Sequence, residues 1–109
     1  MKAGLHEKLA TRANGVCEAC GWEFGTSPAL RPEADHFFGR AKSEEAEDTV
    51  WLLHGRCHRA KTDSEPSTSF WLRRFLVHAE RHGFRAAYDR AFRRLQFVEQ
   101  RAAFGKGAA

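Results

Sequence analysis

The 109-residue chain has no long hydrophobic run, and this absence excludes a transmembrane protein. A membrane-spanning helix needs about 18 consecutive apolar residues. The first ten residues alternate charged and small side chains, without the apolar centre of a signal peptide. Since 42% of the residues are hydrophobic, the chain is neither collagen-like nor wholly disordered. We expect one domain in the cytoplasm, with a modest core.

Cysteine is scarce, and this argues against a disulfide framework. The three thiols cannot all pair within one chain, and no export signal accompanies them. Cys17 and Cys20 form a C-x2-C pair between two glycines, and His54 and Cys57 repeat that spacing. Four such ligands suit a tetrahedral zinc ion, so we predict a structural zinc at this set. A thioredoxin-like redox pair is the competing use of C-x2-C, but it belongs to alternating strands and helices, which this sequence lacks.

Acidic residues are few in the second half of the chain. Residues 1–65 contain 9 Lys and Arg against 11 Asp and Glu, a net charge of −2. Residues 66–109 contain 9 against 3, a net charge of +6. Arginine supplies 13 of the 18 basic side chains, and its guanidinium group matches phosphate oxygens well. The asymmetry indicates either a surface that grips anions or the ordinary solvated faces of helices.

Hydrophobic periodicity predicts an α+β protein. The expected elements are a helix within 1–14, short strands at 34–38 and 50–53, a helix at 55–63, and longer helices at 70–82 and 84–104, the last ended by Gly105. A charged loop is expected over 39–48, and a break with a helix cap over 66–69. The two long helices should pack on each other through the apolar positions 72, 75, 76 and 79 and 84, 87, 88, 91, 95, 98 and 102.

A stripe of arginines flanks the apolar face of the last helix. Arg90, Arg94 and Arg101 follow one another at intervals of four and seven residues. Such a stripe could lie along a phosphate backbone, so these are the predicted nucleic-acid-binding residues. The same helices are also the expected interface for a protein partner or a second copy.

Several motifs in the first half occur in a specific order. They are Cys17-Glu-Ala-Cys20, Ala34-Asp35-His36 and Trp51-Leu-Leu-His-Gly-Arg-Cys57-His58-Arg-Ala-Lys61-Thr62. In this order and spacing they resemble the HNH nuclease family, over residues 15–63 and not over the two last helices. The resemblance implies a ββα-metal fold. In that fold, two short strands and a helix hold one divalent ion, and a zinc knuckle braces them.

The resemblance also implies an activity, the hydrolysis of DNA phosphodiesters to 5′-phosphate and 3′-hydroxyl ends. By position, His36 would be the general base, and Asp35 and His58 would hold a catalytic Mg²⁺, Mn²⁺ or Ni²⁺. The residue types suit these roles, because a neutral imidazole accepts a proton near pH 7. A carboxylate with an imidazole also leaves coordination positions open for water and phosphate. Because side chains alternate along a strand, we expect a strand end or a bulge at Asp35-His36.

Two positions depart from the family pattern. The family usually has a cysteine where this chain has His54, although imidazole binds zinc as well. Thr49 stands near the usual place of an asparagine, and Asn14 is the only asparagine of the chain. Thr49 could brace the neighbouring loop through its hydroxyl, and Asp48 could replace a metal contact. The departure also leaves open a nuclease without activity.

Together these patterns predict two parts of one compact domain. Residues 1–65 would form a ββα-metal nuclease core with its zinc knuckle, and residues 66–109 an Arg-rich helical extension packed on it. The predicted function is a small HNH-type DNA endonuclease of a bacterial cell or phage-infected host. The alternative is a zinc-knuckle module that binds nucleic acid or assembles with a partner without catalysis. The intact Asp35-His36 and His58 favour the enzyme, since a binding module needs none of them.

Overall fold

The computed structural model describes residues 3–39 and 45–107 and confirms the predicted α+β class. The elements in chain order are α1 (Leu5–Ala13), β1 (Pro32–His36), β2 (Val50–His54), α2 (Gly55–Thr62), α3 (Thr68–His82) and α4 (Arg85–Gly107). Of the charged loop predicted over 39–48, residues 40–44 lie outside the described residues. The last helix continues beyond Gly105, so the prediction that this glycine ends it was wrong. An isolated glycine lowers helix stability without necessarily stopping the helix.

The two strands form one antiparallel sheet, which aligns the candidate site residues. Asp35 is paired with Trp51 in the register, and His36 with Val50. Every residue of β2 is buried, whereas β1 is buried only at Asp35. Strand β1 begins and ends two residues earlier than the predicted range 34–38. His36 is therefore the last residue of its strand, as the Asp35-His36 pair led us to expect.

Helix α2 follows β2 without an intervening loop, and a glycine makes this turn possible. The Gly55 amide donates a hydrogen bond to the Arg31 carbonyl, 3.0 Å away. A Cβ atom at this position would lie only 2.1 Å from the Pro28 carbonyl oxygen. Only glycine fits so close a backbone approach. The turn fixes where α2 leaves the sheet, and so where the side chains of its first two turns lie.

The longer helices pack through the faces that the periodicity predicted. Their buried contacts are Leu72, Phe75 and Ala79 of α3 and Ala87, Ala91 and Leu95 of α4. Phe75 also stacks on Phe37 beside the sheet, with ring centroids 4.0 Å apart. Each large side chain that is fully buried contributes about 1.5–3 kcal/mol to folding. Helix α3 thus joins the sheet to α4.

Helix ends are set by local signals in the break regions. The Ser67 hydroxyl caps α3 by accepting a hydrogen bond from the Phe70 amide at 3.1 Å. Gly83 ends α3 in the left-handed conformation, with φ of 72°. Both features agree with the predicted cap over 66–69 and the predicted helix end at residue 82, and Gly83 turns the chain from α3 into α4.

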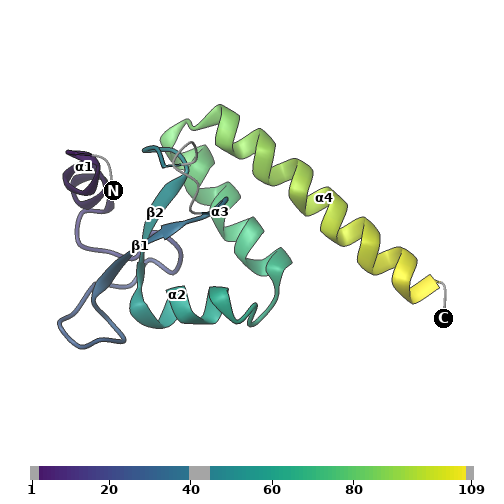
Figure 1. Ribbon diagram of the computed structural model, residues 1–109, viewed down its shortest axis with the longest axis horizontal. Helices are drawn as coiled ribbons and strands as arrows, with labels where there is room; N and C mark the ends of the chain where they lie inside the picture. The colour runs from purple at the N-terminus through teal and green to yellow at the C-terminus, as the bar shows by residue number, and fades with distance from the viewer. Residues whose placement is uncertain (1–2, 40–44, 108–109) are drawn as a thin grey trace.

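The molecule is elongated, with principal extents of 47 × 29 × 24 Å. Helix α1 packs against β2, and α4 extends from the opposite side of the molecule so that its last turns project away from the sheet (Figure 1). The described residues include no helix that is long and apolar enough to cross a membrane.

Candidate metal centres

The four residues predicted as zinc ligands come together in the structure. Cys17 and Cys20 lie in the loop after α1, His54 ends β2, and Cys57 lies in the first turn of α2. Their ligand atoms all lie within 4.8 Å of one another. His54 Nδ1 is 3.3 Å from Cys20 Sγ and 3.9 Å from Cys57 Sγ. This Cys3His set could bind a metal ion such as zinc.

The orientation of His54 suits a ligand. Its ring is fully buried, and Nε2 donates to the Glu23 carbonyl oxygen at 2.7 Å. This hydrogen bond assigns the proton to Nε2 and leaves the Nδ1 lone pair facing the sulfurs. The backbone that supplies Glu23 is held by a bridge between Val16 and Glu23. The loop with the C-x2-C pair thus also supplies the carbonyl that orients the histidine.

The mutual effects of the thiols on their pKa values favour the binding of a cation in this cluster. The hydrogen bond with Cys57 lowers the pKa of Cys17, and the same contact raises the pKa of Cys57. Thiolates crowded into one buried site repel one another, so they cannot all ionise unaided. A dication would remove this repulsion, because thiolate ligands bind zinc deprotonated.

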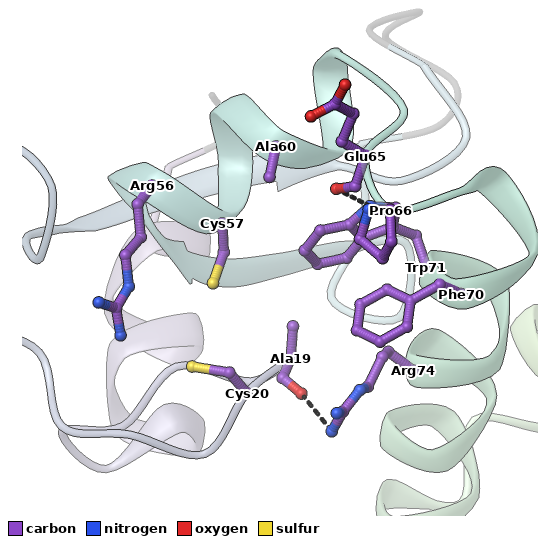
Figure 2. Close-up of a pocket in the computed structure, with 10 residues that line it drawn as sticks. All are labelled: Ala19, Cys20, Arg56, Cys57, Ala60, Glu65, Pro66, Phe70, Trp71 and Arg74. Atoms are coloured by element: carbon purple, nitrogen blue, oxygen red, sulfur yellow. Dashed lines mark hydrogen bonds between the residues drawn. The ribbon is translucent and has the colours of Figure 1, made fainter.

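An open pocket of about 410 Å³ lies beside the cluster. Figure 2 shows the sulfurs of Cys20 and Cys57 on one side of it, with Arg56 and Arg74 at two points of its edge. Arg74 Nη1 donates to the Ala19 carbonyl oxygen at 3.4 Å. Two of the four candidate ligands therefore border this pocket, whereas Cys17 and His54 are buried.

A second polar cluster forms where β1, β2 and α2 meet. It is built around Asp35, which is only 4% exposed. Asp35 Oδ2 accepts a hydrogen bond from Trp51 Nε1 at 2.7 Å, and Lys61 Nζ lies 3.2 Å from the same oxygen. His58 Nε2 lies 3.4 Å from Asp35 Oδ1. The structure thus brings together the two residues predicted to hold a catalytic ion.

Glu33 is part of this cluster, although the sequence reasoning did not find it. His58 Nδ1 lies 2.9 Å from Glu33 Oε1, and this hydrogen bond lowers the pKa of Glu33. With Nδ1 bonded to Glu33, Nε2 is the ring nitrogen of His58 that faces Asp35. The available signal was strand alternation, because Glu33 and Asp35 are two residues apart on one face. Trp51 was also missed, and only the register places it opposite Asp35.

His36 does not share the contacts of this cluster. Its Nε2 lies 3.8 Å from Glu45 Oε2. Alternation along β1 directs His36 and Asp35 to opposite faces of the strand. Among the described residues, the structure therefore pairs the predicted general base with a carboxylate from the following loop and not with Asp35 or His58.

Thr49 braces the backbone beside His36. Its hydroxyl accepts a hydrogen bond from the Ala46 amide at 3.0 Å and lies 3.3 Å from the Ala46 carbonyl oxygen. Its own carbonyl accepts a hydrogen bond from the Phe37 amide at 3.0 Å. The hydroxyl thus closes the turn that leads into β2, and the carbonyl extends the pairing of the strands past His36.

Two of the three predicted DNA-contacting arginines lie near the end of β1. The guanidinium carbon of Arg90 lies 4.2 Å from the ring centroid of Phe38, and that of Arg94 lies 5.6 Å from it. Phe38 follows His36 by two residues. Arg101 instead lies over Phe97, farther along α4. The stripe therefore begins beside the candidate site and leads away from it.

A third polar cluster is buried between α1 and α3. Arg12 makes two 2.8 Å hydrogen bonds to the Glu18 carboxylate, and both side chains are under 10% exposed. His78 and His82 lie 3.5 and 3.8 Å from the same carboxylate. The ligand atoms of Glu18, His78 and His82 are close enough together for a metal site. The guanidinium of Arg12 already neutralises Glu18, however, so this cluster favours a second cation less than the Cys3His set does.

Comparison of the chain with models of known protein families, with curated proteins and with solved structures finds no match.

Proposed function

We propose that this protein is a metal-dependent DNA endonuclease of HNH type. The observation that carries the proposal is the convergence of Asp35 and His58, whose Oδ1 and Nε2 atoms lie 3.4 Å apart. A separate hydrogen bond orients each side chain, from Trp51 to Asp35 and from His58 to Glu33. A carboxylate and an imidazole directed at one point are suitable ligands for Mg²⁺, Mn²⁺ or Ni²⁺.

In the proposed reaction, water attacks the phosphorus of a DNA phosphodiester and the 3′ oxygen leaves. His36, the last residue of β1, would take the proton from the attacking water, which requires its ring to turn toward the side of the strand that holds Asp35 and His58. Thr49 keeps the backbone next to His36 in place through its turn with Ala46. Asp35 and His58 would hold the divalent ion, which would supply charge stabilisation for the leaving oxygen. The products are a 5′-phosphate and a 3′-hydroxyl end.

The remaining parts support this chemistry. The Cys3His cluster would hold a structural zinc that pins the start of α2, and with it His58, to the knuckle. Arg90, Arg94 and Arg101 would bind DNA phosphates without reading sequence. The proposed setting is the cytoplasm of a bacterial cell or of a phage-infected host. The exposed face of α4 also leaves room for a protein partner or a second copy.

A specific observation favours the alternative, a zinc-knuckle module that binds nucleic acid or assembles with a partner without catalysis. The ammonium group of Lys61 lies 3.2 Å from Asp35, where a catalytic ion would require the same carboxylate. Thr49 also replaces the family's asparagine. The two proposals differ in one measurable property, the cleavage of DNA.

The decisive experiment incubates the zinc-loaded protein with supercoiled plasmid, with and without added Mg²⁺, Mn²⁺ or Ni²⁺. We expect nicked or linear plasmid only with an added ion. His36→Ala should slow cleavage about 100- to 10,000-fold, since this is the range of general-base catalysis. Zinc content and DNA affinity should be unchanged. His6→Ala is the matched control, because His6 is exposed on α1.

Two results would contradict the proposal. Cleavage by His36→Ala at the rate of the unmodified protein would remove His36 from the mechanism. Plasmid that stays supercoiled with every ion, while DNA still binds, would instead establish the module without catalysis.

A further inference from the structure

Lys61 forms an ion pair with Asp35, the carboxylate that would hold a metal ion in the proposed function. Its Nζ atom lies 3.3 Å from Asp35 Oδ1 and 3.2 Å from Oδ2. The Lys61 and Asp35 side chains are 19% and 6% exposed, so the pair is largely shielded from water. A buried carboxylate needs such a partner to stay ionised. Lys61 is therefore the counter-ion of the carboxylate that a metal ion would bind.

The same lysine also borders a cavity whose lining includes Arg94, one of the predicted DNA-contacting arginines. This cavity of about 200 Å³ lies between α2, α3 and α4. Lys61 and Arg94 line it with the hydroxyl residues Ser64 and Thr68, and Phe37 forms part of its wall. A water molecule takes about 30 Å³ in the liquid, so a small oxyanion has room here.

Only one of the two cationic side chains that line this cavity has a carboxylate partner among the described residues. Asp35 balances Lys61, whereas Arg94 has no carboxylate within ion-pair distance among the described residues and instead lies over the ring of Phe38. If a divalent ion took over Asp35, the charge of Lys61 would also lose its partner. Two cationic and two hydroxyl-bearing residues line this cavity beside the apolar Phe37, Trp71 and Leu72. Cationic and hydroxyl side chains are the groups that recognise a phosphate.

We propose that this cavity is a subsite for a backbone phosphate of DNA and that it becomes active when a divalent ion displaces Lys61 from Asp35. The inference rests on the proposed function. In the metal-free protein, Lys61 is the counter-ion of Asp35. With the ion bound, its ammonium group and Arg94 bind a phosphate near the scissile one. Lys61 thus makes the affinity for DNA depend on the presence of the ion.

The first test measures Mn²⁺ binding to the zinc-loaded protein by calorimetry, without DNA. Lys61→Met should bind Mn²⁺ about tenfold more tightly, because the ammonium group no longer competes with the ion for Asp35. Arg94→Gln removes an equal charge from the same cavity without touching Asp35, so its affinity should change less than threefold. Asp35→Asn should abolish the binding.

The outcomes separate the two proposals. Unchanged Mn²⁺ affinity in Lys61→Met, or an equal gain in Arg94→Gln, would overturn the displacement of Lys61 while leaving the metal site intact. Mn²⁺ binding that survives Asp35→Asn, or no Mn²⁺ binding by the unmodified protein, would overturn both the proposed catalytic site and this inference.

The second test measures the salt dependence of binding to a short DNA duplex in a His36→Ala background, which prevents cleavage under the proposed mechanism. With Mn²⁺, adding Lys61→Met or Arg94→Gln should each lower the log–log slope by nearly one unit, as the loss of one phosphate contact does. Without Mn²⁺, Lys61→Met should leave the slope unchanged, because Lys61 is then held by Asp35. Lys8→Met is the control, because Lys8 is exposed on α1. The same slope loss by Lys61→Met with and without Mn²⁺ would contradict the switch.

Discussion

His78 shows how much one buried residue can depend on its surroundings. It is 3% exposed, and its ring lies among aromatic neighbours that include Trp51 and Phe75. Its Nε2 atom has no hydrogen-bond partner among the described residues. Burial, together with the charge of Arg12, lowers the pKa of His78 to about 3. The folded protein therefore keeps this histidine neutral at pH values where the unfolded chain would protonate it.

This shift predicts a pH dependence of stability at the residue scale. Between about pH 6.5 and pH 3 the unfolded chain binds one proton more at His78 than the folded protein does. The free energy of unfolding should therefore fall as the pH falls through this window, by up to about 1.4 kcal/mol per pH unit. His78→Phe should remove this contribution, measured by urea unfolding at several pH values.

His6→Phe is the control for His78→Phe, since His6 is exposed. Part of the pH dependence should remain in His78→Phe, because burial also lowers the pKa of His82. A slope identical to that of the unmodified protein would show that His78 is already accessible to protons in the folded state.

At the scale of elements, the Cys3His cluster brings together parts of the chain that are far apart in the sequence. It connects the loop after α1, the end of β2 and the start of α2. Glu18, between the two knuckle cysteines, adds a second attachment, because its carboxylate accepts hydrogen bonds from Arg12 and from the Leu52 amide. A sheet of only two short strands has little stability of its own. The arrangement of these segments should therefore depend on the metal.

Replacing one ligand tests this dependence. Cys17→Ser should lose the zinc and unfold much of residues 15–63, because the binding of a structural zinc provides about 10–16 kcal/mol in small zinc domains. Elemental analysis and circular dichroism would measure the two effects, with one zinc per chain expected in the unmodified protein. Freshly purified, reduced and folded protein that contains no zinc would contradict the assignment.

At the scale of the whole molecule, the two halves of the chain differ in net charge and lie in different parts of the structure. Residues 66–109 carry the positive charge on α3 and α4, and α4 extends away from the sheet (Figure 1). Arg90 and Arg94 lie over Phe38 near the candidate catalytic residues, and Arg101 is 11 residues farther from Arg90 along the helix, a rise of about 16 Å. A phosphate backbone that crosses the site could follow this helix.

Changing Arg90, Arg94 and Arg101 together to Gln should weaken DNA binding and leave the fold intact, since Gln keeps the helix propensity. The log–log slope of affinity against salt should fall by about two to three units, and cleavage should be normal once DNA is saturating. A salt titration by fluorescence anisotropy measures the slope. An unchanged slope would mean that this face of α4 is solvated surface or binds a protein.

The sequence by itself determined the class of fold, the order of the elements and the residues of the Cys3His cluster. Repeated C-x2-C and H-x2-C spacing identifies the ligands because a metal accepts few residue types at fixed separations. Hydrophobic periodicity likewise located the packed faces of α3 and α4, since burial follows the helical repeat. These signals are local, so they can be read along the chain.

Only the tertiary structure decided which side chains share a site. The pairing of Asp35 with Trp51 depends on strand register, and the contacts of Glu33 and Lys61 depend on how α2 leaves the sheet at Gly55. The position of His36 on the other face of β1 also follows from the strand and not from its place beside Asp35. Such contacts join residues far apart in the chain, and their distances are set by packing, which no spacing along the sequence encodes.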